Sequence, residues 1–176
     1  MIYQNKFKRY LNDLAAKKPA PGGGSAVSLV FCLGAALIEK ALKYSVTSNK
    51  TFSPEIKRLS KLRERILTYS DLDGQLFSEI FKSKDAKKIE AVKNSEKIVV
   101  DIGKSCLVVL DLVKKVEFFV KKGIISDFII GRETIVVVLE GCILNLEANS
   151  KMFGSNSAYT DKFKTVLSNE RILRSG

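Results

Sequence analysis

The feature that most constrains the fold is an apolar run over residues 25–47, which follows directly on a Pro/Gly-rich segment at residues 19–24. Two prolines and three successive glycines forbid helix over the segment. The run itself is apolar on nearly every side, which in a soluble domain is typical of an enclosed helix. We therefore predict a long enclosed central helix that begins at Ser25.

Further segments have apolar residues at helical spacing, over residues 3–16, from residue 53 onward, over 85–121, and from 126–127 onward. Ser53-Pro54-Glu55 predicts a helix start with a capping hydroxyl. The β-branched runs within the third and fourth of these segments would suit buried strands, so an α/β fold is the alternative, but no turn residues bound them. The sequence predicts an all-α bundle of about five to six helices, a single domain over residues 1–176.

The net charge of +11 favours an anionic partner, which can be a nucleic acid, a phosphorylated metabolite, a polycarboxylate or an acidic membrane surface. The thirty Lys and Arg residues are spread along the chain without interleaved aromatic residues, a pattern that argues against nucleic acid. Residues 1–18 carry charges throughout, and the uncharged stretch 19–38 leaves only about 13 helical residues where a membrane span needs about 20. We expect a cytoplasmic protein without a membrane partner.

Cysteine and histidine usage narrows the possible chemistry. Each of the three cysteines lies within an apolar run, as expected of free thiols in a core: Cys32, Cys106 and Cys142. The chain contains no histidine, which excludes a Ser-His-Asp or Cys-His nucleophile and removes the commonest transition-metal ligand. We predict no metal site and no tightly bound cofactor.

The Pro/Gly-rich segment is also the first candidate ligand site. Its glycines let a ligand approach the backbone closely, and the free amides of the following helix start favour an anion. The alternative is a purely structural role, a sharp turn before a tightly packed helix. The candidate binding residues are Pro21, Gly22, Gly23, Gly24 and Ser25.

A second candidate is one face of the predicted fifth helix, where steps of three or four residues connect seven positions that are unusually small or polar. Glycines there permit close approach by a flat ligand or by another backbone, and two carboxamides one turn apart suit a heterocycle. Tight helix packing with satisfied amides is the alternative. The seven are Asp127, Gly131, Thr134, Val138, Gly141, Asn145 and Asn149.

Asp73 places a carboxylate on the otherwise apolar face of the third helix. If it is buried, its pKa is raised into a range suited to proton transfer, which a chain without histidine must assign to a carboxylate, Lys or Tyr. Alternatively, Asp73-Gly74 marks a turn that interrupts the helix.

The segment AAKKPAPGGGSA at residues 15–26, leading into LGAAL at residues 33–37, resembles the opening of the cyclodeaminase/cyclohydrolase family. That family includes the C-terminal domain of formiminotransferase-cyclodeaminase and bacterial methenyltetrahydrofolate cyclohydrolases. Weaker agreements in the same order are Asp73 with Phe77, Ser126 with Asp127, and Asn145 with Asn149.

The resemblance implies an all-helical homodimer that acts on a tetrahydrofolate derivative bound between helices near the subunit interface. It implies that Asp73 or Asp127 moves protons, while the glycine-rich helix start, Ser126, Asn145 and Asn149 bind the substrate. Folate glutamates would fit the basic net charge, and the reaction would be cyclodeamination or cyclohydrolysis. The Leu-Pro-Lys segment that is familiar in the family is absent after the third helix, so the alternative is a catalytically impaired folate-binding or assembly protein on the same scaffold.

Overall fold

The computed structural model of the chain describes residues 2–155 and 157–175 and is helical almost throughout. Two short 3-10 turns, Glu117–Phe119 and Lys122–Ile124, connect the fourth and fifth helices. Within the described residues there is no β-sheet, so the predicted all-α class is confirmed. The helices are α1 (Ile2–Ala15), α2 (Gly23–Ser45), α3 (Ser53–Lys82), α4 (Asp85–Val116), α5 (Ile125–Phe153) and α6 (Tyr159–Ser175).

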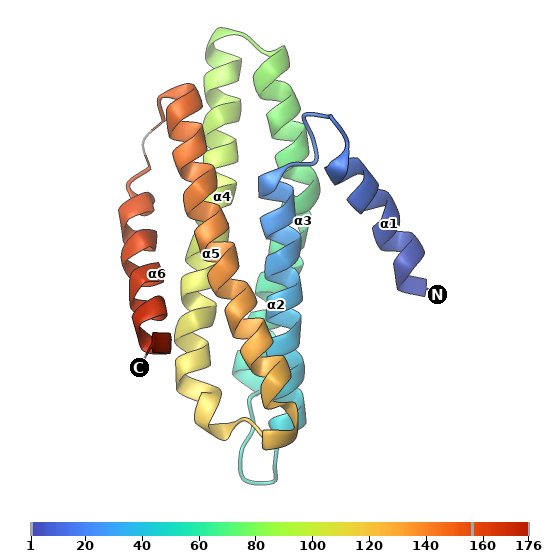
Figure 1. Cartoon of the computed structure of the whole chain (residues 1–176), viewed down its shortest axis with the longest axis vertical. Coiled ribbons are helices and arrows are strands. Elements are labelled where there is room, and N and C mark those ends of the chain that lie inside the picture. Colours follow the sequence, from blue (N-terminus) through green and yellow to red (C-terminus); the bar gives the residue numbers. More distant parts are fainter. Residues whose placement is uncertain (1, 156, 176) are drawn as a thin grey trace.

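Four long helices, α2 to α5, form an elongated bundle around the core (Figure 1). The central helix α2 packs on α3 and α5, and α4 packs on the same two neighbours. Helix α6 lies against α5 and α4 on one side of the bundle, while α1 projects on the other side. The three cysteines are free and buried in this core, as their apolar surroundings predicted.

Helix α2 lies at the centre of the bundle, but one of its sides is uncovered. The side chains of Leu33 and Tyr44 are 52% and 63% exposed, so the prediction of a helix enclosed on every side is wrong for this face. Among the described helices, α2 alone is long and apolar enough to cross a membrane, and 56% of its most apolar window is buried by the bundle. Such burial is typical of the core helix of a soluble protein.

Glycines set the close contact between α2 and α5. A Cβ at Gly34 would lie 3.0 Å from the carbonyl oxygen of Gly131, and a Cβ at Gly131 would lie 2.8 Å from the carbonyl oxygen of Gly34. Side chains at these positions would push the two backbones apart. The small face predicted on the fifth helix is therefore a helix–helix contact at Gly131, the packing alternative rather than a ligand surface.

Several predicted boundaries differ from those observed. Helix α3 runs unbroken through Asp73-Gly74, so the alternative of a turn at this point is excluded. Pro54 lies in the first turn as predicted, but no side-chain cap forms, and the Ser53 hydroxyl lies 2.8 Å from that of Thr51 instead. Helix α4 ends at Val116 rather than near Lys121, because the chain tightens into 3-10 turns before α5.

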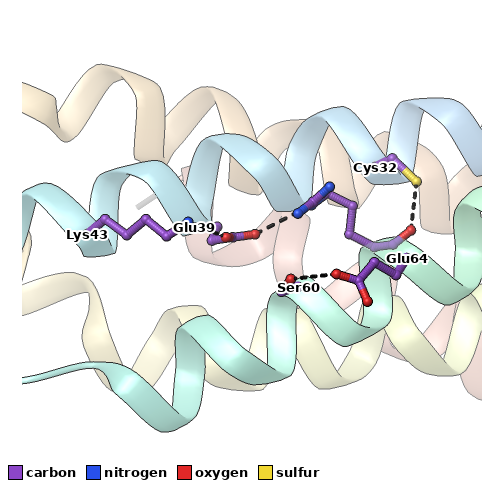
Figure 2. A network of polar contacts seen from close by, with 6 residues as sticks. Cys32, Glu39, Lys43, Ser60 and Glu64 are labelled. Atoms are coloured by element: carbon purple, nitrogen blue, oxygen red, sulfur yellow. Dashed lines mark hydrogen bonds and ion pairs between the residues drawn. The ribbon is translucent and has the colours of Figure 1, made fainter.

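A buried carboxylate ties α2 to α3. The Glu39 side chain is 7% exposed, and its two oxygens lie 2.6 Å from Lys43 Nζ and 3.4 Å from Arg63 Nε (Figure 2). The Arg63 carbonyl accepts a hydrogen bond from the Cys32 thiol, which lies two turns nearer the start of α2 than Glu39. Each oxygen of this buried carboxylate therefore contacts a cation, one on α2 and one on α3.

Candidate functional site

The start of α2 and the middle of α3 meet at a buried carboxylate. Asp73 Oδ2 accepts a hydrogen bond of 3.0 Å from the backbone N–H of Ser25. A Cβ at Gly24 would overlap the same carboxylate, so only glycine fits between it and the α2 backbone. The glycine-rich segment and Asp73, which the sequence singled out separately, therefore form one site.

The electrostatic setting of Asp73 is unusual for a carboxylate. The residue is buried, and among the described residues no Lys or Arg forms an ion pair with it. Burial raises its pKa, and the hydrogen bond from the Ser25 N–H opposes this rise only partly. The group is thus easier to protonate than a surface aspartate, as proton transfer near neutral pH requires.

Asn145 reaches the same helix start from α5. Its Oδ1 would lie 3.1 Å from a Cβ at Gly23, and its Nδ2 donates a hydrogen bond to the Gly141 carbonyl. Asn149 lies one turn further along α5 and is partly exposed. Helices α3 and α5 therefore place polar side chains at Gly24 and Gly23. One of the hydrogen bonds that Asn145 can donate is already made to its own helix.

Beside this carboxylate lies a cleft of about 590 Å³, a size that suits a small-molecule ligand. Pro21 and Ser25 contribute to its wall, and so does Gly74, the neighbour of Asp73 in the chain. The α3 side chains that line it are polar or charged: Ser70, Asp71, Gln75, Ser78, Glu79 and Lys82. Of the predicted binding residues in the glycine segment, Pro21 and Ser25 thus line the cleft, and Gly24 lies against the Asp73 carboxylate.

Helix α1 closes one side of the cleft, a position that the sequence did not predict. The Tyr10 hydroxyl lies 3.1 Å from the Ser25 Oγ, and Asp13 lines the cleft nearby. In the sequence, Tyr10 is one of the apolar residues at helical spacing over residues 3–16. Its spacing from Ser25 carried no signal, because the irregular segment between the two helices decides where α1 lies.

Ser126 and Asp127 lie elsewhere. The Lys40 Nζ contacts Asp127 Oδ2 at 2.6 Å, near the opposite end of α2 from Ser25. Fifteen helical residues separate Ser25 from Lys40, a distance of about 22 Å at 1.5 Å per residue. Within one chain, the structure therefore does not bring Ser126 and Asp127 together with Asp73, the glycines and Asn145.

The predicted absence of a metal site stays a prediction. Among the described residues, no group of three or more His, Cys, Asp or Glu side chains is placed to hold a metal ion. The acid groups around the cleft come from α1 and α3 and remain apart.

The chain matches a known protein family over most of its length. The family model of formiminotransferase-cyclodeaminase matches residues 6–169, nearly the whole chain. The chain belongs to this family. The matched span of the formiminotransferase-cyclodeaminase family contains the glycine segment, Asp73 and every other predicted site residue.

A solved structure also resembles this member of the formiminotransferase-cyclodeaminase family. It is the crystal structure of formiminotetrahydrofolate cyclodeaminase from Thermotoga maritima, with a TM-score of 0.75 and 20% sequence identity. The likeness covers 93% of this chain and 84% of that one, and it shows that the two share a fold. No curated protein sequence matches the chain.

Proposed function

We propose that this protein is a folate one-carbon enzyme that cyclodeaminates 5-formiminotetrahydrofolate at the start of α2. The observation that carries the proposal is the buried, cation-free Asp73 carboxylate beside a ligand-sized cleft. Membership of the formiminotransferase-cyclodeaminase family supports the substrate class. The name of the Thermotoga maritima protein, which has the same fold, supports the same choice.

The proposed reaction needs one proton acceptor and one proton donor, and a single carboxyl group can serve as both. N10 of the substrate attacks the formimino carbon, and the carboxylate of Asp73 takes the proton that N10 loses. The formimino group enters as its protonated amidinium, so attack by N10 leaves an NH2 group on the carbon. The protonated carboxyl gives its proton to this NH2 group, and ammonia leaves as the carbon–nitrogen bond breaks and the methenyl cation forms. A pKa raised by burial suits both steps, because it brings the group nearer to balance between its two forms.

The polar lining of the cleft suggests which end of folate it holds. Asp13, Asp71 and Glu79 line it together with a single cation, Lys82. Carboxylates accept hydrogen bonds, and the pterin ring offers amino and amide N–H donors. We place the pterin against these acids and the glutamate carboxylates away from them. The basic net charge therefore does not attract the substrate at this cleft.

We also propose that the protein acts as a homodimer through the uncovered side of α2 and α5. Large apolar side chains are exposed along both neighbouring helices: Leu33, Tyr44, Ile130, Val137 and Leu144. Exposed apolar patches of this kind mark interaction surfaces. A second copy would also bring Ser126 and Asp127 to the site of Asp73. Within one chain, about 22 Å of helix α2 lies between Ser25 and Lys40, the partner of Asp127.

The activity test measures the methenyl chromophore formed from 5-formiminotetrahydrofolate and, in a second assay, its loss when 5,10-methenyltetrahydrofolate is supplied. We expect formation of the chromophore together with release of ammonia. Turnover of the methenyl compound alone would instead establish a cyclohydrolase. Folate binding by calorimetry without either reaction would establish the impaired binding protein, and no binding at all would overturn the folate assignment.

The dimer test compares Leu33→Asp with Leu67→Asp, a leucine of similar exposure on α3. We expect a dimer for the wild-type protein and for Leu67→Asp in light scattering coupled to gel filtration. Leu33→Asp should give a folded monomer, because it buries an unpaired charge at the interface. A wild-type protein that is monomeric would refute the proposal.

A further inference from the structure

A second cleft lies between α4 and the start of α6. Helix α6 lies on the opposite side of the bundle from α1 (Figure 1). The cleft has a volume of about 430 Å³, and Tyr159, the first residue of α6, forms part of its wall. Three lysines of α4 line it: Lys93 and Lys97 lie one turn apart, and Lys104 lies two turns further along the helix. The positive end of the α6 dipole lies at the same place.

The positive charge of this cleft is not neutralised by the acids beside it. Asp101 lines the cleft, but its Oδ2 already lies 2.8 Å from the Tyr69 hydroxyl and 3.2 Å from Arg65 on α3. Glu96 is the other acid in the wall. Lys93 and Lys97 lie at positions i and i+4 of α4. Repulsion between like charges at this spacing destabilises a helix slightly. A bound anion would remove this repulsion.

An apolar cleft of about 410 Å³ adjoins the basic one, and both include Lys93 in their walls. Its lining includes Ile89 and Met152, whose side chains are 57% and 60% exposed, together with Phe153. Exposed apolar side chains beside a row of lysines form a groove with one charged half and one apolar half. We call this the α4 groove.

We propose that the α4 groove binds a small anion with phosphate or carboxylate groups on an apolar or aromatic body, the charged end at Lys93, Lys97 and Lys104. The limited volumes of the two clefts, about 430 and 410 Å³, suit a small molecule rather than an extended nucleic acid, which would need a continuous track of cations. The inference is independent of the proposed folate site, which lies on the other side of the bundle and has an acidic lining.

The test measures binding of phenyl phosphate, inorganic phosphate and triglutamate by calorimetry. We expect one molecule of phenyl phosphate per chain, bound about tenfold more tightly than inorganic phosphate because the ring buries apolar surface. Triglutamate offers carboxylates without an apolar body, so it should bind more weakly than phenyl phosphate, and tighter binding of triglutamate would overturn the proposal. Absence of binding by all three would overturn the proposal, and so would equal affinity for the two phosphates.

A matched pair of variants separates the groove from the general positive field. Lys93→Gln with Lys97→Gln should weaken binding of the preferred anion at least about tenfold, because each removes a charge-assisted hydrogen bond. Lys57→Gln with Lys61→Gln has the same spacing and charge change on the exposed side of α3 and should change the affinity less than about twofold. Equal weakening by both pairs would refute the site. Circular dichroism of both variants verifies that the fold is retained.

Discussion

Two buried carboxylates of this bundle have opposite surroundings. The Glu170 side chain on α6 is fully buried and lies 2.6 Å from Lys114 Nζ on α4 and 3.2 Å from an Arg132 nitrogen on α5. Asp73 on α3 is also buried, yet it accepts its hydrogen bond from the backbone N–H of Ser25 rather than from a cation. One carboxylate joins three helices through cations, while the other faces a helix start beside a cleft.

The difference teaches which buried charge holds the bundle and which one is free for chemistry. A buried carboxylate that contacts cations on two other helices fixes the three helices relative to one another. Burial without a cation raises the pKa of a carboxyl group. Such burial lowers stability but makes the group better suited to acid–base chemistry. Replacing each carboxyl by its amide tests this contrast.

The largest effect is expected for Asp73→Asn on catalysis. The amide keeps the shape and can still accept the Ser25 hydrogen bond, but it cannot move a proton. We expect kcat for formation of the methenyl chromophore to fall about 10² to 10⁴-fold, the usual contribution of a general acid–base group. Asp111→Asn, an exposed acid on α4, is the control and should retain wild-type kcat. A variant at Asp73 with unchanged kcat would remove this residue from the mechanism.

Glu170→Gln should instead act on stability. It leaves Arg132 and Lys114 without their partner, and removal of one member of a buried ion pair destabilises by about 3 to 5 kcal/mol. We expect the lower end of this range, because the Lys114 side chain is half exposed and can be solvated. Urea unfolding followed by circular dichroism measures the free energy of unfolding. A loss no greater than that of Asp73→Asn would abolish the contrast between the two carboxylates.

The sequence predicted one of these carboxylates and missed the other for a physical reason. Asp73 interrupts an apolar stripe, so its burial follows from the helical period. Glu170 lies on a short, mostly polar helix, and its burial depends on where α6 packs against α4 and α5, which no local pattern encodes. The same holds for Tyr10, whose place at the cleft depends on the direction of α1.

Helix geometry also explains the mixed outcome on α5. The period correctly grouped Asp127 and Asn145 on the side of α5 that faces α2, as the contacts with Lys40 and Gly23 show. Period alone ignores length: 18 residues of helix separate the two by about 27 Å. One face of a long helix is therefore longer than one ligand site. The helical period tells which residues share a face, and the rise per residue tells which of them are close enough to share a site.

Gly24→Ala tests the close approach that brings Asp73 to the helix start. Its methyl group would overlap the carboxylate, so Asp73 or the α2 backbone must move, which we expect to destabilise the protein by about 1 to 3 kcal/mol. The same displacement should lower kcat. Gly123→Ala is the control, since a Cβ there meets no atom within 4 Å, and it should change stability by less than about 0.5 kcal/mol. Equal unfolding free energies for the two variants would mean that the Gly24 contact is not tight in solution.

The smallest effect is the pH dependence of stability at Asp73. Its pKa is raised in the folded protein above the ordinary value of 3.8, so the unfolded chain gives up this proton more readily than the folded one. As pH rises from about 3.8 through the folded pKa, the wild-type protein therefore loses stability relative to Asp73→Asn; below that interval, the difference between them is constant. Urea unfolding of both proteins across this range measures the difference directly. A wild-type protein that instead gained stability relative to the variant as pH rose would show that the fold stabilises the ionised form of Asp73. That result would remove the contrast between Asp73 and Glu170.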